Sequence, residues 1–109
     1  MSTYENCVEM NRQHPDTFEI PTGGEIAGLM PGDYVKLIFL LPPNLPGMPA
    51  SERMWVEVTE VDQPEAGSFR GRLSNTPVFL KDTKFGELVT PFRAEHIASV
   101  MYTRPKTVQ

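Results

Sequence analysis

Cysteine is almost absent from the chain, which has one, Cys7, among 109 residues. A single thiol excludes an intramolecular disulfide and a zinc site built from several cysteines. Free thiols without disulfides are typical of a reducing compartment. The N-terminal residues also lack the basic start and apolar stretch of a signal peptide. We therefore expect a cytoplasmic protein.

Long apolar runs and basic runs are also missing. The longest apolar run, Leu37–Leu41, falls far short of the roughly 20 residues that span a bilayer. The formal net charge of −4 disfavours non-specific binding to nucleic acid or to an anionic membrane. Residues 1–50 contain two basic and six acidic side chains, whereas residues 51–109 contain eight of each. A local basic patch is therefore compatible only with the second half.

Motifs for catalysis and metal binding are absent as well. The chain has no His-Glu-x-x-His, no calcium-binding loop and no glycine-rich phosphate loop. Its two histidines, His14 and His96, are far apart in the sequence, and we expect His96 to be a hydrogen-bonding structural residue. Cys7 lies in a polar segment, which disfavours a nucleophilic pair with either histidine. We predict no catalytic residues, no metal and no cofactor.

Proline is abundant instead, with 11 residues, which predicts many turns and no long helix. The length suits a single domain, expected over residues 1–103. Within it we expect a polar N-terminal segment (residues 1–16) and a β-rich core (residues 17–102), followed by a loose C-terminal tail (residues 104–109).

The N-terminal segment contains one possible short helix. Ser2 and Glu5 have the spacing of a capping box, which predicts a helix over Thr3–Gln13. The helix should end near His14, because the following proline disfavours helical geometry. Residues 18–21 are expected to be extended, and the pair of glycines at 23–24 is expected to form a loop.

Strand signals begin after Met30–Asp33, where a Pro-Gly pair predicts a type II turn with Gly32 at positive φ. Tyr34–Leu41 is apolar on nearly both faces, which predicts a strand covered on two sides. Residues 42–52 contain four prolines and are expected to form a long loop. Its PxxP pattern is compatible with partner binding, but a stiff connector is the simpler interpretation.

A β-hairpin is the clearest prediction. Arg53–Val61 alternates between apolar and polar residues, and Ser68–Ser74 alternates in the same way after a turn. Aligning the apolar faces predicts the register. The expected pairs are Val56 with Leu73, Val58 with Gly71, Glu57 with Arg72, Thr59 with Arg70, and Trp55 with Ser74.

The rest of the chain predicts further short elements. We expect a short strand at Val78–Leu80, a glycine turn at Gly86, one helical turn at Ala94–His96 and a last strand at Ile97–Tyr102. Together these features predict a mainly β (β-rich α+β) fold. The expected architecture is a small curled antiparallel sheet, an SH3-like partly open barrel with a short helical or extended N-terminal segment.

The candidate binding residues are Trp55, Glu57, Arg70 and Arg72, which share the polar face of the hairpin by strand parity. A tryptophan beside arginines is typical of protein interfaces, and it can also stack on a nucleic-acid base. The simpler interpretation is that the N-terminal segment or the proline-rich loop covers Trp55. A second candidate surface is the acidic first half, which would suit a basic partner.

Several segments in a fixed order carry a resemblance to a known family. The chain resembles a bacterial family of small proteins, domain of unknown function twenty-three-fourteen, over about residues 15–100. That family has no settled activity, so the resemblance implies no catalytic residues. Similar small bacterial domains occur beside polymorphic toxins, where immunity proteins are found. The resemblance rests on residues 14–18 (His-Pro-Asp-Thr-Phe), 20–21 (Ile-Pro), 31–39 (Pro-Gly-Asp-Tyr-Val-Lys-Leu-Ile-Phe), 52–58 (Glu-Arg-Met-Trp-Val-Glu-Val), 71–77 (Gly-Arg-Leu-Ser-Asn-Thr-Pro) and 95–97 (Glu-His-Ile).

Three functions from different classes follow. We favour a non-catalytic protein-binding module, with an immunity-like role as one form of it, whose partner and oligomeric state the sequence does not identify. The first alternative is a small barrel that binds nucleic acid through Trp55, Arg70, Arg72, Lys81 and Lys84. The second, less favoured than the first, is an enzyme with an unrecognised site.

Overall fold

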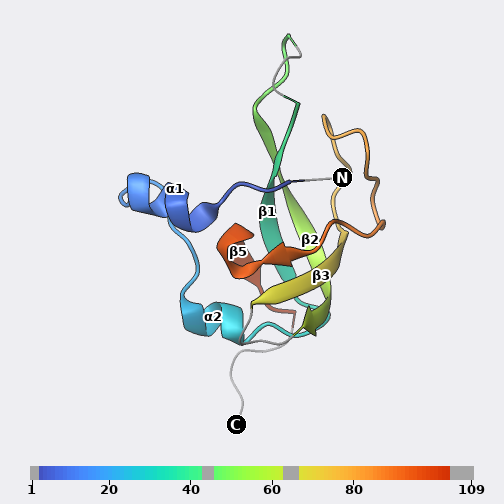
Figure 1. The fold of residues 1–109 in the computed structure, drawn as a ribbon. Helices are drawn as coiled ribbons and strands as arrows, with labels where there is room; N and C mark the ends of the chain where they lie inside the picture. The colour runs from blue at the N-terminus through green and yellow to red at the C-terminus, as the bar shows by residue number, and fades with distance from the viewer. Residues whose placement is uncertain (1–2, 43–45, 63–66, 104–109) are drawn as a thin grey trace.

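A single antiparallel sheet of five strands, in the order β4-β3-β2-β1-β5, forms the body of the protein. The computed structural model describes residues 3–42, 46–62 and 67–103. The sheet curls into a half-barrel (Figure 1), which confirms the predicted mainly β, SH3-like partly open barrel. The strands are β1 (Tyr34–Leu40), β2 (Ser51–Asp62), β3 (Ser68–Leu73), β4 (Phe92–Arg93) and β5 (Ile97–Met101).

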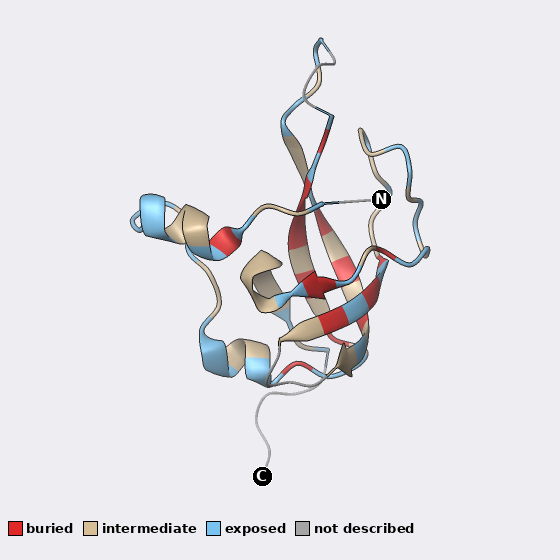
Figure 2. Cartoon of the chain, in the orientation of Figure 1, coloured by how far each residue is buried: buried red, intermediate tan, exposed pale blue. Residues whose placement is uncertain are grey.

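The concave side of the sheet carries the hydrophobic core. Along β2 the side chains of Met54, Val56 and Val58 are buried, while those between them are partly exposed, as the period of two in a strand requires. Figure 2 shows the buried residues gathered where the strands face one another. Burying an aliphatic or aromatic side chain of this kind stabilises the fold by about 1.5–3 kcal/mol. The core consists of Leu29, Val35, Leu37, Phe39, Met54, Val56, Val58, Phe69, Leu73, Val89, Phe92 and Ile97.

The β2–β3 hairpin has the predicted register over its first half. Val56 pairs with Leu73, Glu57 with Arg72, and Val58 with Gly71. Beyond that point the predicted pair of Thr59 with Arg70 is wrong.

A β-bulge between Val58 and Glu60 places Glu60, not Thr59, opposite Arg70. The extra residue allows the next apolar side chain of β2 to pack on the core. Without it, strict alternation would turn Glu60 toward the core, whereas the bulge turns Val61 inward, where it packs against the buried cluster.

The N-terminal segment joins the sheet before its helix begins. Tyr4 bridges to Phe39, and the N–H of Glu5 donates to the carbonyl of Ile38 at 2.9 Å. The ring of Tyr4 packs edge-on against Phe39 and Phe92, and its hydroxyl donates to the carbonyl of Thr90. This segment therefore continues the edge of the sheet alongside β1.

Residues 3–5 pair with β1, so the predicted helix does not include them, and Glu5 is not part of a capping box. Ser2, the other residue of that predicted box, lies outside the described residues. Helix α1 spans Cys7–Gln13, and its N-cap is Asn6, whose side chain accepts the N–H of Glu9 at 3.0 Å. The predicted end of the helix before His14 is confirmed.

The predicted loop at Gly23 and Gly24 is also wrong, because both residues belong to helix α2 (Gly23–Ala27). Thr22 and Glu25 form a capping box: the Thr22 hydroxyl accepts the N–H of Glu25, and the Glu25 carboxylate accepts the N–H of Thr22. The Thr-x-x-Glu spacing is a helix-start signal that outweighs the glycine pair. The Tyr102 hydroxyl then donates to the Glu25 carbonyl at 2.6 Å and fastens α2 to the chain beyond β5.

The turn before β1 has the predicted form. Gly32 has a φ of 99°, and the N–H of Asp33 donates to the carbonyl of Met30 at 3.0 Å. Asp33 itself is fully buried. Its carboxylate accepts the N–H of Met30 at 3.0 Å and that of Thr103 at 3.1 Å, so it ties the end of β5 to the start of β1.

The segment Val78–Leu80 does not form the predicted strand. Its three backbone N–H groups donate to the carboxylate of Glu52 instead, and the longest of these hydrogen bonds is 3.0 Å. The Glu52 carboxylate thus accepts the hydrogen bonds that these backbone N–H groups would otherwise donate to carbonyl groups of a neighbouring strand. The predicted turn at Gly86 (φ 86°), the helical turn η2 (Ala94–His96) and the last strand are confirmed.

The hairpin register depends on a close approach at Gly71. A Cβ atom at this position would lie 2.5 Å from the carbonyl oxygen of Glu57 and 2.6 Å from Val56 Cγ1. We expect Gly71→Ala to lower the free energy of unfolding by about 1–3 kcal/mol, measured by urea denaturation. The control is Gly23→Ala, where no atom lies within 4 Å of the added Cβ. Equal stability of the two variants would contradict the close approach.

The interaction of Glu52 with three backbone donors predicts a dependence of stability on pH. Partial burial raises the pKa of Glu52, but hydrogen bonds from Val78, Leu80 and Phe79 outweigh it, so the pKa lies below its ordinary value of 4.5. The stabilisation is then complete above pH 4.5 and is lost as the pH falls through the folded-state pKa.

We therefore expect Glu52→Gln to lose about 1–3 kcal/mol at pH 7 and to differ less from wild type in acid, as measured by denaturant titrations across this pH range. A constant difference at every pH would contradict the carboxylate's role.

Candidate protein-interaction surface

The outer face of the sheet carries a row of polar and apolar side chains. Tyr34 lies opposite Glu57, Glu57 opposite Arg72, and Arg72 opposite Leu88 through an isolated bridge. Directly opposite residues of antiparallel strands point to the same face. Arg72 is exposed, and Leu88 is 62% exposed. This row brings together two of the predicted site residues, Glu57 and Arg72.

Trp55 lies beside this row on the same face. It is partly exposed and does not belong to the core cluster, which confirms its predicted position on the polar face. Lys36, its partner on β1, places its Nζ 4.8 Å from the centre of the indole ring, a cation–π arrangement. The N–H of Ser74 donates to the Trp55 carbonyl at 2.9 Å, as the predicted pairing of these residues requires. We call Lys36, Trp55, Glu57, Arg72 and Leu88 the outer-face patch.

The two arginines of the predicted site have different surroundings. Arg70 Nε lies 3.0 Å from a carboxylate oxygen of Asp62 and 3.5 Å from one of Glu60. Arg72 donates to the carbonyl of Gly86 at 3.1 Å. Two carboxylates therefore offset the charge of Arg70, whereas Arg72 is fixed in the outer-face patch by a neutral acceptor.

Sequence reasoning missed Lys36 and Leu88. The chain between β1 and β2 is too long for a turn type to fix their register, so the pairing of Lys36 with Trp55 has no local signal. Leu88 belongs to a segment whose exposed apolar side chains include Val78 (71% exposed) and Phe85 (64%). Exposed apolar side chains next to an aromatic residue and an arginine are a feature of binding surfaces.

Cys7 and His96 come together, but not in a reactive arrangement. The Cys7 thiol is buried and donates to the backbone carbonyl of His96, with 3.4 Å between sulfur and oxygen. Burial, with the charge of Glu5, raises the pKa of the Cys7 thiol to about 11, which disfavours the nucleophilic thiolate.

The imidazole of His96 is held by the backbone. Its Nδ1 accepts the N–H of Arg93 at 3.0 Å, so the predicted structural role of His96 is confirmed. Burial lowers the pKa of His96, against the opposing charge of Glu95.

Three of the six acidic side chains in the first half of the chain have local structural roles. Asp33 is buried in the turn before β1, Glu25 caps α2, and Glu9 pairs with Arg12 on α1. The buried Asp33 therefore takes no part in the predicted acidic surface, and Glu9 and Glu25 also make local interactions. In the proline-rich loop, Pro46 and Pro49 are exposed. Three segments for which predictions were made lie outside the described part of the chain: residues 43–45 of this loop, residues 63–66 of the hairpin turn and residues 104–109 of the tail.

No protein-family model, curated protein or solved structure matches the chain. Within residues 3–42, 46–62 and 67–103, no group of three or more His, Cys, Asp or Glu side chains is arranged to hold a metal ion. In the same described ranges, no helix has the length and apolarity to cross a membrane.

The outward position of Trp55 makes a testable difference to stability. Phe69 is buried in the core, and we expect Phe69→Ala to cost about 3–5 kcal/mol. Trp55 is partly exposed, so Trp55→Ala should lower the free energy of unfolding by less than about 1.5 kcal/mol. This loss comes from the cation–π contact with Lys36 and from the part of the indole ring that is buried. Chemical denaturation of both variants measures the difference. Similar losses would contradict the placement of Trp55 outside the core.

Proposed function

We propose that the chain is a non-catalytic protein-binding module that recognises its partner through the outer-face patch. The observation that carries the proposal is that partly exposed Trp55, in a cation–π contact with Lys36, shares the outer face of the sheet with exposed Arg72 and exposed Leu88. Tryptophan and arginine are the residue types most enriched among interface hot spots. Side chains on a packed sheet lose little conformational freedom on binding, which favours affinity.

The biological setting is part of the same proposal. We propose that the chain belongs to the bacterial family of domain of unknown function twenty-three-fourteen and acts in the cytoplasm, where an immunity-like protein would neutralise a toxin by covering its surface. The sequence segments that carry this resemblance include the Trp55 strand and the Arg72 strand, so they coincide with the two central strands of the outer-face patch.

Binding to nucleic acid is the less favoured alternative. Arg70, one of its required residues, lies against Asp62 and Glu60, and the chain has a net charge of −4. Lys81 and Lys84 are exposed but add only two positive charges to this set of residues. Affinity for nucleic acid would fall steeply with salt concentration, which separates this function experimentally from protein binding.

The proposal is tested by affinity co-purification from the source cell with wild type and a Trp55→Ala, Arg72→Glu double variant. Lys81→Glu is a control with the same charge reversal at an exposed site outside the outer-face patch. We expect one stoichiometric protein partner with wild type and the control, and at least about a tenfold loss with the double variant.

Thermal melting must show that the double variant is folded. Retention of the partner by a folded double variant, or recovery of nucleic acid alone, would refute the proposal.

A further inference from the structure

A groove runs along the free edge of β5, on residues separate from the outer-face patch. Its larger part has a volume of about 560 Å³, within the range of ligand-binding pockets. A smaller part of about 210 Å³ continues past Ala98, Ser99 and Val100. Ile20 and Pro21 line both parts, so the two hollows adjoin at the segment that leads into α2, and together they border β5.

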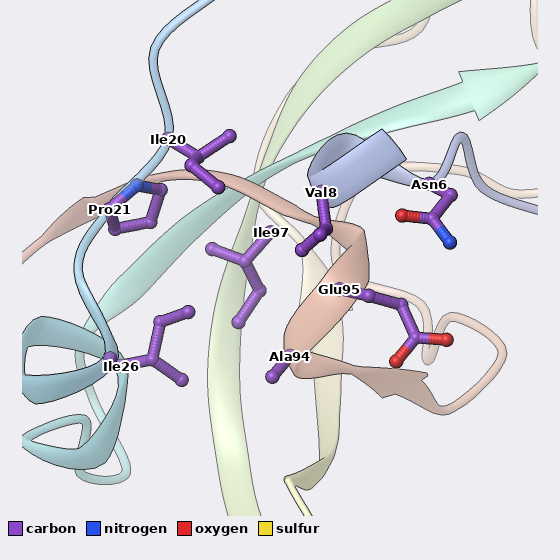
Figure 3. Close-up of a pocket in the computed structure, with 9 residues that line it drawn as sticks. Asn6, Val8, Ile20, Pro21, Ile26, Ala94, Glu95 and Ile97 are labelled. Carbon is purple, nitrogen blue, oxygen red and sulfur yellow. The ribbon is translucent and has the colours of Figure 1, made fainter. Parts of the chain in front are cut away.

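The floor of the larger part of the groove is mostly apolar. Val8 of α1 is 51% exposed and points toward Ala94 and Ile97, while Ile20 and Ile26 face them from the other side (Figure 3). Although Val8 is exposed to solvent, its side chain forms part of the apolar wall of the groove. A bound apolar side chain would therefore be covered from three sides.

Carboxylates lie along the same groove. Glu95 lines one end, and Glu19 and Glu25 line the other. Arg93 Nε is 3.7 Å from the Glu95 carboxylate and offsets part of its charge, and Glu25 is used by the α2 cap. Glu19 is exposed, which leaves a negative rim around an apolar floor.

The third feature is the strand itself. β5 is at the edge of the sheet, because its neighbour in the strand order is β1 alone. An edge strand offers backbone donors and acceptors to an added strand. We propose that this groove binds an extended segment of a partner protein, in which apolar side chains alternate with lysine or arginine, by adding that segment to β5.

Strand addition explains why the apolar floor and the acidic rim occur together. In an extended peptide alternate side chains point to opposite sides, so two apolar residues enter the groove while the basic residues between and beside them meet the rim. A second copy of this chain fits less well. Pairing β5 with β5 would bring the Glu19 and Glu95 rims of both copies together, and each chain has a net charge of −4.

The probe is a capped pentapeptide, Lys-Val-Thr-Val-Lys, compared with Glu-Val-Thr-Val-Glu. Each is titrated into the isotopically labelled full chain, and backbone amide shifts are followed by nuclear magnetic resonance. We expect the lysine peptide to shift the amides of residues 97–100 and the glutamate peptide to leave them unchanged. Failure of the lysine peptide to shift these amides, or equal shifts from both peptides, would overturn the proposal.

Variants separate the rim from the floor. We expect Glu19→Lys to weaken the lysine peptide about fivefold and Val8→Ser to weaken it about tenfold. Glu60→Lys is the matched charge reversal outside the groove and should leave the affinity unchanged, as should the Trp55→Ala, Arg72→Glu variant. Loss of peptide binding in that double variant, or a concentration-dependent dimer that shifts residues 97–100 without peptide, would overturn the proposal.

Because the peptide and the co-purified partner are measured separately, failure of one proposal leaves the other standing.

Discussion

The close approach of β2 and β3 at Gly71 is the constraint on which the rest of the structure depends. No side chain larger than hydrogen fits there, because the Glu57 carbonyl and the Val56 side chain occupy the space. This contact fixes which residues of β2 and β3 lie opposite one another. In a strand, a shift of one residue would exchange the two faces. The core and the outer-face patch are therefore two consequences of one register.

The bulge after Val58 is the second adjustment that makes this register work. It keeps Val61 and Phe69 on the concave side while Glu60 and Arg70 stay outside. The open side of the half-barrel is then closed by parts of the chain that are distant in sequence. Tyr4 packs on Phe39 and Phe92, and the buried Asp33 carboxylate joins the turn before β1 to Thr103, two residues after β5.

Local patterns were enough to predict the hairpin, the turn at Gly32, the helical turn before β5 and the fold class. Alternation, glycine at positive φ and proline placement act within a few residues, so the sequence shows them directly. The strand role of Tyr4 could not be predicted, because its partner Phe39 is distant in sequence and no periodic pattern joins them. The bulge was missed because strand parity assumes one residue opposite each residue. Helix α2 was missed because the glycine pair predicts a loop, and the Thr-x-x-Glu spacing of its capping box was not recognised.

In the candidate site too, some residues are placed by local patterns and others only by pairing between distant segments. Trp55, Glu57 and Arg72 follow from parity within the hairpin, which is why sequence reasoning placed them on one face. Arg70 shares that parity, but its carboxylate partners depend on the bulge. Lys36 and Leu88 complete the surface only through pairings outside the hairpin.

The register of β1, β2 and β3 turns Trp55 outward, against Lys36 and away from the core. Nuclear Overhauser contacts of the indole protons, measured on the full chain, test it most directly, because Trp55 is the only tryptophan. We expect contacts from the indole ring to the side-chain methylene protons of Lys36. Contacts from the ring to the methyl groups of Val35 and Leu73, with none to Lys36, would contradict both the register and the surface built on it.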